Sequence, residues 1–179
     1  MWTTENARID AQLAGLKTAL TIAIVLDRVL ILPRFHCFSK STGSYVECPL
    51  NSLLGITAFD AGFGSRYRES SFLRHPLVPD AVRHNVSLKY FISTPATTNT
   101  VRGVTRHTNE TIAVRQYSTD SISADQLRQL LGIDQHRVLS LASLERVRVT
   151  FKSADRQRIF DETVNASFKR SDYRQFAYN

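Results

Sequence analysis

The sequence predicts an α/β fold: a Rossmann-like layered sheet, partly parallel, with helices on both faces and a long irregular loop region. Two observations carry this prediction. A helical segment runs directly into an apolar strand near the N-terminus, and the same helix-then-strand order returns in the last third of the chain. Strands that alternate with helices usually pair in parallel and are covered by those helices. A length of 179 residues suits one such domain over residues 1–179.

The first helix is expected over residues 4–26, where apolar side chains recur every three or four positions. The strand at 28–33 follows at once, is apolar on both faces like a central parallel strand, and ends on proline. Ligands of open α/β sheets bind outside the carboxyl ends of the strands. Arg34 and His36 at this end are therefore candidates for binding an anionic or sugar ligand. The alternative is a local ion pair for Arg34 and a packed or solvated His36.

In the middle of the chain, apolar residues do not recur at the regular spacing of a helix or a strand. Residues 35–80 are expected to be irregular apart from one short helix within 47–56, and residues 60–85 form a long ordered loop rich in Gly, Ser, Arg and Pro. Loops of this length in compact domains are often functional. Three of its charged residues are candidates for clamping a phosphate or carboxylate, with surface salt bridges as the alternative: Arg66, Arg68 and Glu69.

The last third should contain strands and two helices. Strands are expected at 86–92, 111–117 and 137–144. Ser123 and Gln126 form a capping box before a helix at 124–131, and Gly132 follows as its C-terminal cap. Apolar and polar side chains alternate over residues 146–151, which is typical of a strand. The alternative is a loop that leads into a final helix at 153–176. That helix should bury Ile159, Phe160, Val164, Phe168 and Phe176.

Cys37 and Cys48 are the only cysteines. Two cysteines do not make a zinc site unaided, so a short loop-closing disulfide in an oxidising compartment is expected. Three N-glycosylation patterns agree with that compartment, at Asn85, Asn109 and Asn165. The N-terminus does not resemble a signal peptide, and the longest apolar run is too short to span a membrane. We therefore expect a fragment or module of a longer protein whose targeting segment lies elsewhere.

The net charge of +7 and the pI of about 9.8 raise the question of nucleic-acid binding. The basic residues are mostly arginines spread along the chain and form no block, so nucleic acid is not expected as a partner. Arginine also suits small anionic ligands such as nucleoside diphosphates. No motif for a metal site, a nucleotide-cradling loop or a catalytic nucleophile is found, so catalytic residues stay unassigned.

Several segments taken together are similar to a known enzyme family. They are a helix with the pattern AL.IA..L.R, a strand ending in Leu32-Pro33, Cys37, the run Cys48-Pro49-Leu50, and the pattern R..SFL..P..P over residues 68–79. This order covers roughly half of the chain. It resembles the region downstream of the Asp-x-Asp domain in plant and algal cell-wall arabinosyltransferases, of the nucleotide-diphospho-sugar transferase class. The first part also resembles the amino-terminal lobe of protein O-fucosyltransferases.

The resemblance implies a Golgi or secretory glycosyltransferase that uses a sugar nucleotide as donor substrate and a glycoprotein or glycan as acceptor, with no other cofactor. An Asp-x-Asp motif is absent from this chain. Two alternatives therefore stay open: a catalytic half whose arginines neutralise the diphosphate leaving group, or a non-catalytic accessory or glycan-recognition module of a larger transferase. In either case other domains of the same longer chain are expected partners.

Overall fold

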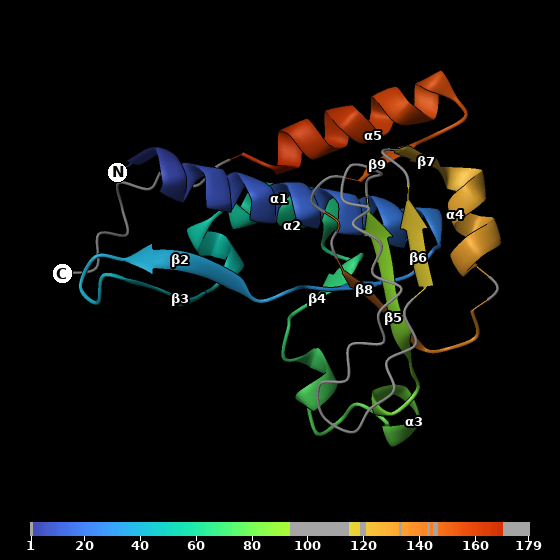
Figure 1. The fold of residues 1–179 in the computed structure, drawn as a ribbon, viewed down its shortest axis with the longest axis horizontal. Helices are drawn as coiled ribbons and strands as arrows, with labels where there is room; N and C mark the ends of the chain where they lie inside the picture. The colour runs from blue at the N-terminus through green and yellow to red at the C-terminus, as the bar shows by residue number, and fades with distance from the viewer. Residues whose placement is uncertain are drawn as a thin grey trace.

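The computed structural model describes residues 2–93, 115–118, 121–132, 134–142, 144 and 147–169. Within these ranges the chain is a mixed α/β protein arranged along one long helix, α1 (Trp2–Val25), which crosses the molecule in Figure 1. The shorter helices are α2 (Ile56–Phe63), α3 (Asp80–Arg83), α4 (Ala124–Leu131) and α5 (Ala154–Ser167), together with the 3₁₀ turns η1 (Leu50–Ser52) and η2 (Phe72–Arg74).

The described strands form several small sheets instead of one continuous layer. In the parallel sheets β1 (Leu30–Ile31) pairs with β4 (Tyr67–Arg68), β5 (Val86–Ser93) lies between β6 (Arg115–Ser118) and β8 (Val138–Ala142), and β7 (Ser121–Ser123) pairs with β9 (Arg148–Thr150). The antiparallel hairpin joins β2 (Phe35–Ser39) to β3 (Ser44–Cys48). Parallel pairing agrees with the predicted α/β class, whereas these strands do not make a single Rossmann-like layer.

Two hydrophobic clusters lie along α1, one toward each end of the helix. The first joins Leu16 and Leu20 of α1 to the aromatic side chains of α2 and to α5, and the second joins Ile22 and Val25 to α4, β7 and β9. Both clusters contain side chains that are completely buried, among them Leu20, Phe59, Val164 and Leu127. Because α1 belongs to both clusters, it sets the position of the N-terminal elements relative to the C-terminal ones.

The helix α1 ends in a turn that sends the chain directly into β1. Arg28 N–H donates to the Ala23 carbonyl at 2.8 Å and Asp27 N–H donates to the Ile24 carbonyl at 3.2 Å, the two bonds of a Schellman motif. Asp27 has a φ of 50°, the left-handed conformation that glycine usually takes at this position. An aspartate is tolerated there better than most side chains.

The predicted first helix is confirmed, but the strand after it is shorter and more exposed than expected. The β1 strand covers only two residues, and Val29 keeps 49% of its surface exposed. The prediction that this strand is buried on both faces like a central strand is therefore wrong for its first half. Among the described residues β1 has a neighbour, β4, on one edge only, so it is an edge strand and not a central one.

The prediction of an irregular segment at 35–80 is also wrong in part, because it contains the β2–β3 hairpin and α2. Gly43 turns the hairpin with a φ of 64°. Most residues of its strands are half-buried or exposed and only Phe35 is buried, so they lack the regular alternation of buried and exposed side chains that marks a half-buried strand. The helix α2 has no side-chain cap at its start. It is held instead by packing on α5, where Phe59 is fully buried.

The elements of the last third follow the sequence closely. Ser123 Oγ accepts from the Gln126 amide at 3.2 Å and Gln126 Oε1 accepts from the Ser123 amide at 2.9 Å, which confirms the capping box. Residues 148–150 form a strand and not a loop. The final described helix, α5, ends at Ser167, and Ile159 is 56% exposed, contrary to prediction, because α5 packs on the rest of the protein along one side only. Phe176 lies outside the described residues.

Candidate functional site

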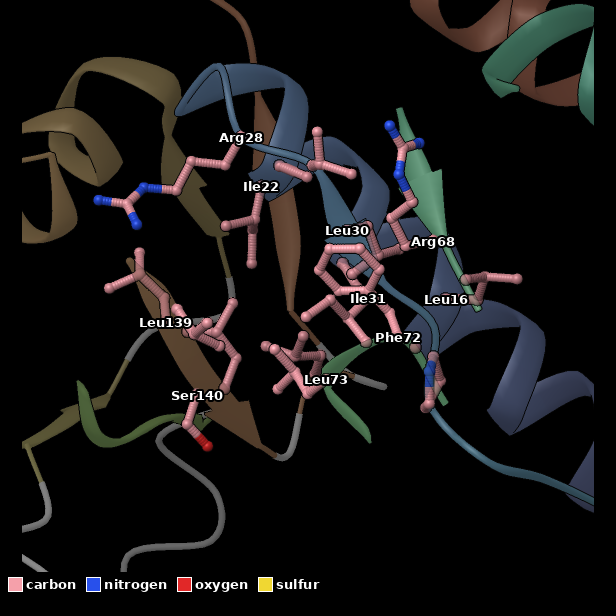
Figure 2. A pocket seen from close by; sticks show the side chains of 18 of the residues that line it. Leu16, Ile22, Arg28, Leu30, Ile31, Arg68, Phe72, Leu73, Leu139 and Ser140 are labelled. Atoms are coloured by element: carbon pink, nitrogen blue, oxygen red, sulfur yellow. The ribbon is translucent and has the colours of Figure 1, made fainter. Parts of the chain in front are cut away.

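A cavity of about 830 Å³ lies between β1 and β8, with α1 forming one wall. Figure 2 shows Leu30 and Ile31 on one side of this space and Leu139 and Ser140 on the other, with Ile22 from α1 between them. Most of the lining is aliphatic or aromatic. The polar side chains are the four arginines at 28, 34, 68 and 137, with Gln12 and Ser140.

Two of the predicted binding residues, Arg34 and Arg68, line this cavity. They come from different elements, and the parallel register explains why they share one end of the sheet. Arg68 pairs with Ile31 across the β1–β4 ladder, and Arg34 follows Ile31 by three positions. The carboxyl ends of β1 and β4 therefore place Arg34 and Arg68 along the same rim of the cavity. The position of Pro33 at the strand end predicts this place for Arg34, whereas the sequence placed Arg68 in a separate loop.

The two rim arginines differ in how strongly other groups hold them. Arg34 Nη1 lies 3.4 Å from Glu47 Oε2, with both side chains about half exposed. Such an exposed pair is weak. Arg68 Nη1 donates to the carbonyl oxygen of Tyr67 at 2.7 Å, and no carboxylate of the described residues lies within ion-pair distance of it. The guanidinium charge of Arg68 is thus available to an anion.

Arg28 and Arg137 also line the cavity, and sequence reasoning missed both. Arg28 Nη1 and Nη2 donate to the carbonyl oxygens of His136 and Asp134 at 2.8 and 2.7 Å, so Arg28 joins the start of β1 to the segment before β8. A signal was present in the sequence. The runs RVLIL at 28–32 and RVLSL at 137–141 each place one arginine immediately before an apolar strand.

The other predicted binding residues lie outside the cavity lining. His36 is exposed, and its backbone is held by Gln12 through hydrogen bonds of 2.8 and 2.9 Å. Arg66 pairs with Asp27 at 2.8 Å, which matches the surface salt-bridge alternative. Glu69 is exposed and contributes to raising the pKa of Tyr67. The structure therefore does not bring His36, Arg66 and Glu69 together with Arg34 and Arg68.

Tyr67, on β4 beside the rim, has a strongly perturbed phenol. Burial, a hydrogen bond that its hydroxyl donates to Asp60, and the nearby carboxylates of Asp60 and Glu69 together raise the pKa of Tyr67 to about 12. The ring packs against Phe59 with centroids 5.1 Å apart. Tyr67 thus stays protonated near neutral pH and anchors β4 to α2.

The described lining of the cavity combines cationic side chains with apolar walls. No Asp, Glu, His, Lys, Cys or Tyr is among the described residues that line it, and Ser140 supplies the one hydroxyl group among them. Nowhere in the described ranges do three metal-binding side chains gather at one point. Guanidinium groups around apolar walls suit a ligand with an anionic group and an apolar body.

The cysteine pair forms the predicted disulfide. Cys37 on β2 and Cys48 on β3 are bonded, with their Cα atoms 5.7 Å apart, and the bond closes the hairpin. A disulfide fits a lumenal or secreted environment. Asn85 and Asn165 are exposed, and Asn109 lies outside the described residues. None of the helices in the described part of the chain combines the length and hydropathy that crossing a membrane requires.

Comparison with known proteins returned no match to a protein-family model, a curated protein or a solved structure.

Proposed function

We propose that this chain is a glycosyltransferase-related domain of the secretory pathway that binds a sugar nucleotide at the rim formed by Arg34 and Arg68. The acceptor is a glycoprotein or glycan, and the Golgi is the compartment. The family resemblance of segments within residues 11–90 motivates the class of enzyme, and the rim is the place at which we propose that the donor binds. We further propose that the complete domain contains a Rossmann-like layered sheet.

One observation carries the proposal. Two arginines, Arg34 and Arg68, lie at the carboxyl ends of the parallel strands β1 and β4, and both line a cavity whose described lining contains no carboxylate. This is where open α/β sheets bind their ligands. A diphosphate placed there would have its charge compensated by Arg34 and Arg68, which is the stabilisation that a nucleoside diphosphate needs as a leaving group.

The second candidate is a non-catalytic accessory or recognition module of a larger transferase. Two observations favour it: the sequence holds no Asp-x-Asp motif, and the described cavity lining offers no acid or base. In that case the rim would bind a sugar nucleotide or an anionic glycan, while a separate domain performs the transfer.

Titration with uridine and guanosine diphosphates tests the proposal. Binding is monitored by calorimetry or by the chemical shifts of backbone amides. We expect binding that weakens as salt is added, because the contacts are ionic. Arg34→Ala and Arg68→Ala should each weaken binding about tenfold or more, since a hydrogen bond to a charged group contributes about 1.5–3 kcal/mol.

Arg74→Ala is the matched control, because Arg74 is an exposed arginine on the nearby turn η2 that does not line the cavity. This variant should bind like the unchanged protein. Absence of binding at millimolar nucleotide, or equal losses in all three variants, would refute the rim site. Binding without any hydrolysis or transfer of a supplied sugar nucleotide would favour the accessory module.

A further inference from the structure

The edge of β1 that faces the cavity has no strand partner among the described residues. The amides of Leu30 and Leu32 donate to the carbonyl oxygens of Arg66 and Arg68 at 2.8 and 2.9 Å, which pairs one edge of the strand with β4. Backbone groups of successive residues in a strand point to opposite edges. The amide and carbonyl of Ile31 therefore point away from β4, on the side where Ile31 lines the cavity.

The strand β8 presents its edge to the same cavity. It is the terminal strand of the sheet β6–β5–β8, so within the described ranges only β5 pairs with it. Leu139 and Leu141 of β8 line the cavity opposite Ile31. The cavity thus separates the edges of two parallel sheets, and Figure 2 shows Leu139 across the open space from Leu30 and Ile31.

The two strands begin at the same end of the cavity. Arg28 lies two residues before β1, and it donates to the carbonyl of His136, two residues before β8. The strands β1 and β8 are not paired with each other, and a cavity of about 830 Å³ lies between them. The gap is therefore wider than the spacing of about 4.8 Å between paired strands, and the strands that border it start together.

We propose that this gap is a strand-addition site that takes one extended peptide, running parallel to β1 and β8 and joining the β4–β1 pair to the β8–β5–β6 sheet. Main-chain hydrogen bonds to both edges would provide affinity, as in other cases of β-augmentation. The apolar walls formed by Leu16, Ile22 and Leu73 require apolar side chains in the middle of the peptide.

The charges of the lining specify the ends of that peptide. Arg28 and Arg137 stand at the starting end of the strands, Arg34 and Arg68 stand at the finishing end, and no described lining residue is acidic. A peptide with carboxylates toward its ends is complementary to this pattern. The strand edges carry this inference without the proposed function. Arg34 and Arg68 also form the proposed nucleotide rim, so a diphosphate and the peptide would compete for these two arginines.

A synthetic peptide of alternating valine and threonine with a glutamate at each end serves as the probe, at about nine residues or roughly 30 Å extended. Hydrogen exchange of the Ile31 amide is the readout. We expect saturating peptide to slow this exchange at least tenfold, while the Leu32 amide, already bonded to β4, changes little. The same peptide with lysine ends should bind more weakly at low salt.

Two controls make the test specific. A peptide with proline at its centre loses main-chain donors and should not protect Ile31. Gly15→Leu adds a side chain to the α1 wall of the cavity and should block protection, whereas Lys17→Leu, at a position that does not line the cavity, should leave it intact. Both substitutions favour the helix or are neutral for it. Circular dichroism and thermal unfolding of the two variants check that each is folded before their exchange is compared.

Protection of Ile31 by the glutamate peptide alone would support the site. Two results with peptide would overturn it: no protection of the Ile31 amide at millimolar peptide, or equal protection by the proline peptide. Protection of Ile31 that grows with protein concentration in the absence of peptide would also overturn it, because the edge would then pair with a second copy of the chain. Nucleoside diphosphate titration without the peptide tests the rim site by itself, so failure of the strand-addition site and failure of the rim site can be told apart.

Discussion

The hydroxyl of Thr18 donates a hydrogen bond of 3.0 Å to the backbone carbonyl oxygen of Val147, a residue 129 positions further along the chain. Both residues are buried. The bond joins the middle of α1 to the segment that enters β9, next to the second hydrophobic cluster. It therefore links the first helix to the last third of the chain.

Removing this hydrogen bond should destabilise the whole domain. Thr18→Val keeps the shape of the side chain but leaves the Val147 carbonyl without this donor, at a cost of about 1–3 kcal/mol in the free energy of unfolding. Urea unfolding measures the loss. Thr18→Ser, which keeps the hydroxyl, should lose clearly less. Equal losses would show that the methyl group matters and the hydrogen bond does not.

The disulfide should stabilise the hairpin by constraining the unfolded chain. Its cysteines are 11 residues apart, and closing a loop of that size contributes about 2–3 kcal/mol in a chain-entropy model. Replacing both residues, Cys37→Ala with Cys48→Ala, should lower the free energy of unfolding by that amount. It should also speed amide exchange in β2 and β3 more than in α4. Uniform acceleration across all elements would contradict a local role for the hairpin.

The Tyr67 phenol makes stability depend on alkaline pH. Burial and the bond to Asp60 raise the pKa of Tyr67 to about 12 in the folded protein, above the ordinary value of 10.0. The stabilisation is therefore fully present below pH 10 and is lost as the pH rises from 10 to 12. Unfolding of the unchanged protein and of Tyr67→Phe should be compared over this range. The loss of stability with pH should be smaller in Tyr67→Phe, and identical curves would refute the assignment.

The left-handed residue at the end of α1 can be tested by substitution. Asp27→Ala places a side chain at a φ of 50° without a compensating contact and also removes the ion pair with Arg66, so we expect a loss of about 1 kcal/mol. Asp27→Gly removes the same ion pair but relieves the backbone, and should be more stable than Asp27→Ala. Thermal unfolding measures the stability of the unchanged protein and of the two variants. A higher melting temperature for Asp27→Ala than for Asp27→Gly would contradict backbone strain at this position.

Local signals explain which elements could be predicted from the sequence. The three- and four-residue spacing of apolar side chains identified α1, the pair Ser123 and Gln126 identified the start of α4, and the two cysteines identified the disulfide. Each of these depends on residues close together in the chain. The β2–β3 hairpin was missed because burial does not alternate regularly along its strands, and α2 was missed because it depends on packing against α5.

The candidate site depended on contacts between distant segments. The sequence by itself placed Arg34 at a strand end and Arg68 in a long loop, and it determined that the chain is α/β with one cross-linked cysteine pair. Only the tertiary structure decided that β4 pairs in parallel with β1, which brings Arg34 and Arg68 to one rim, and that Arg28 reaches across to the segment before β8. Strand pairing and the gap between sheet edges arise from contacts between residues far apart in the chain, and no local pattern of side chains encodes them.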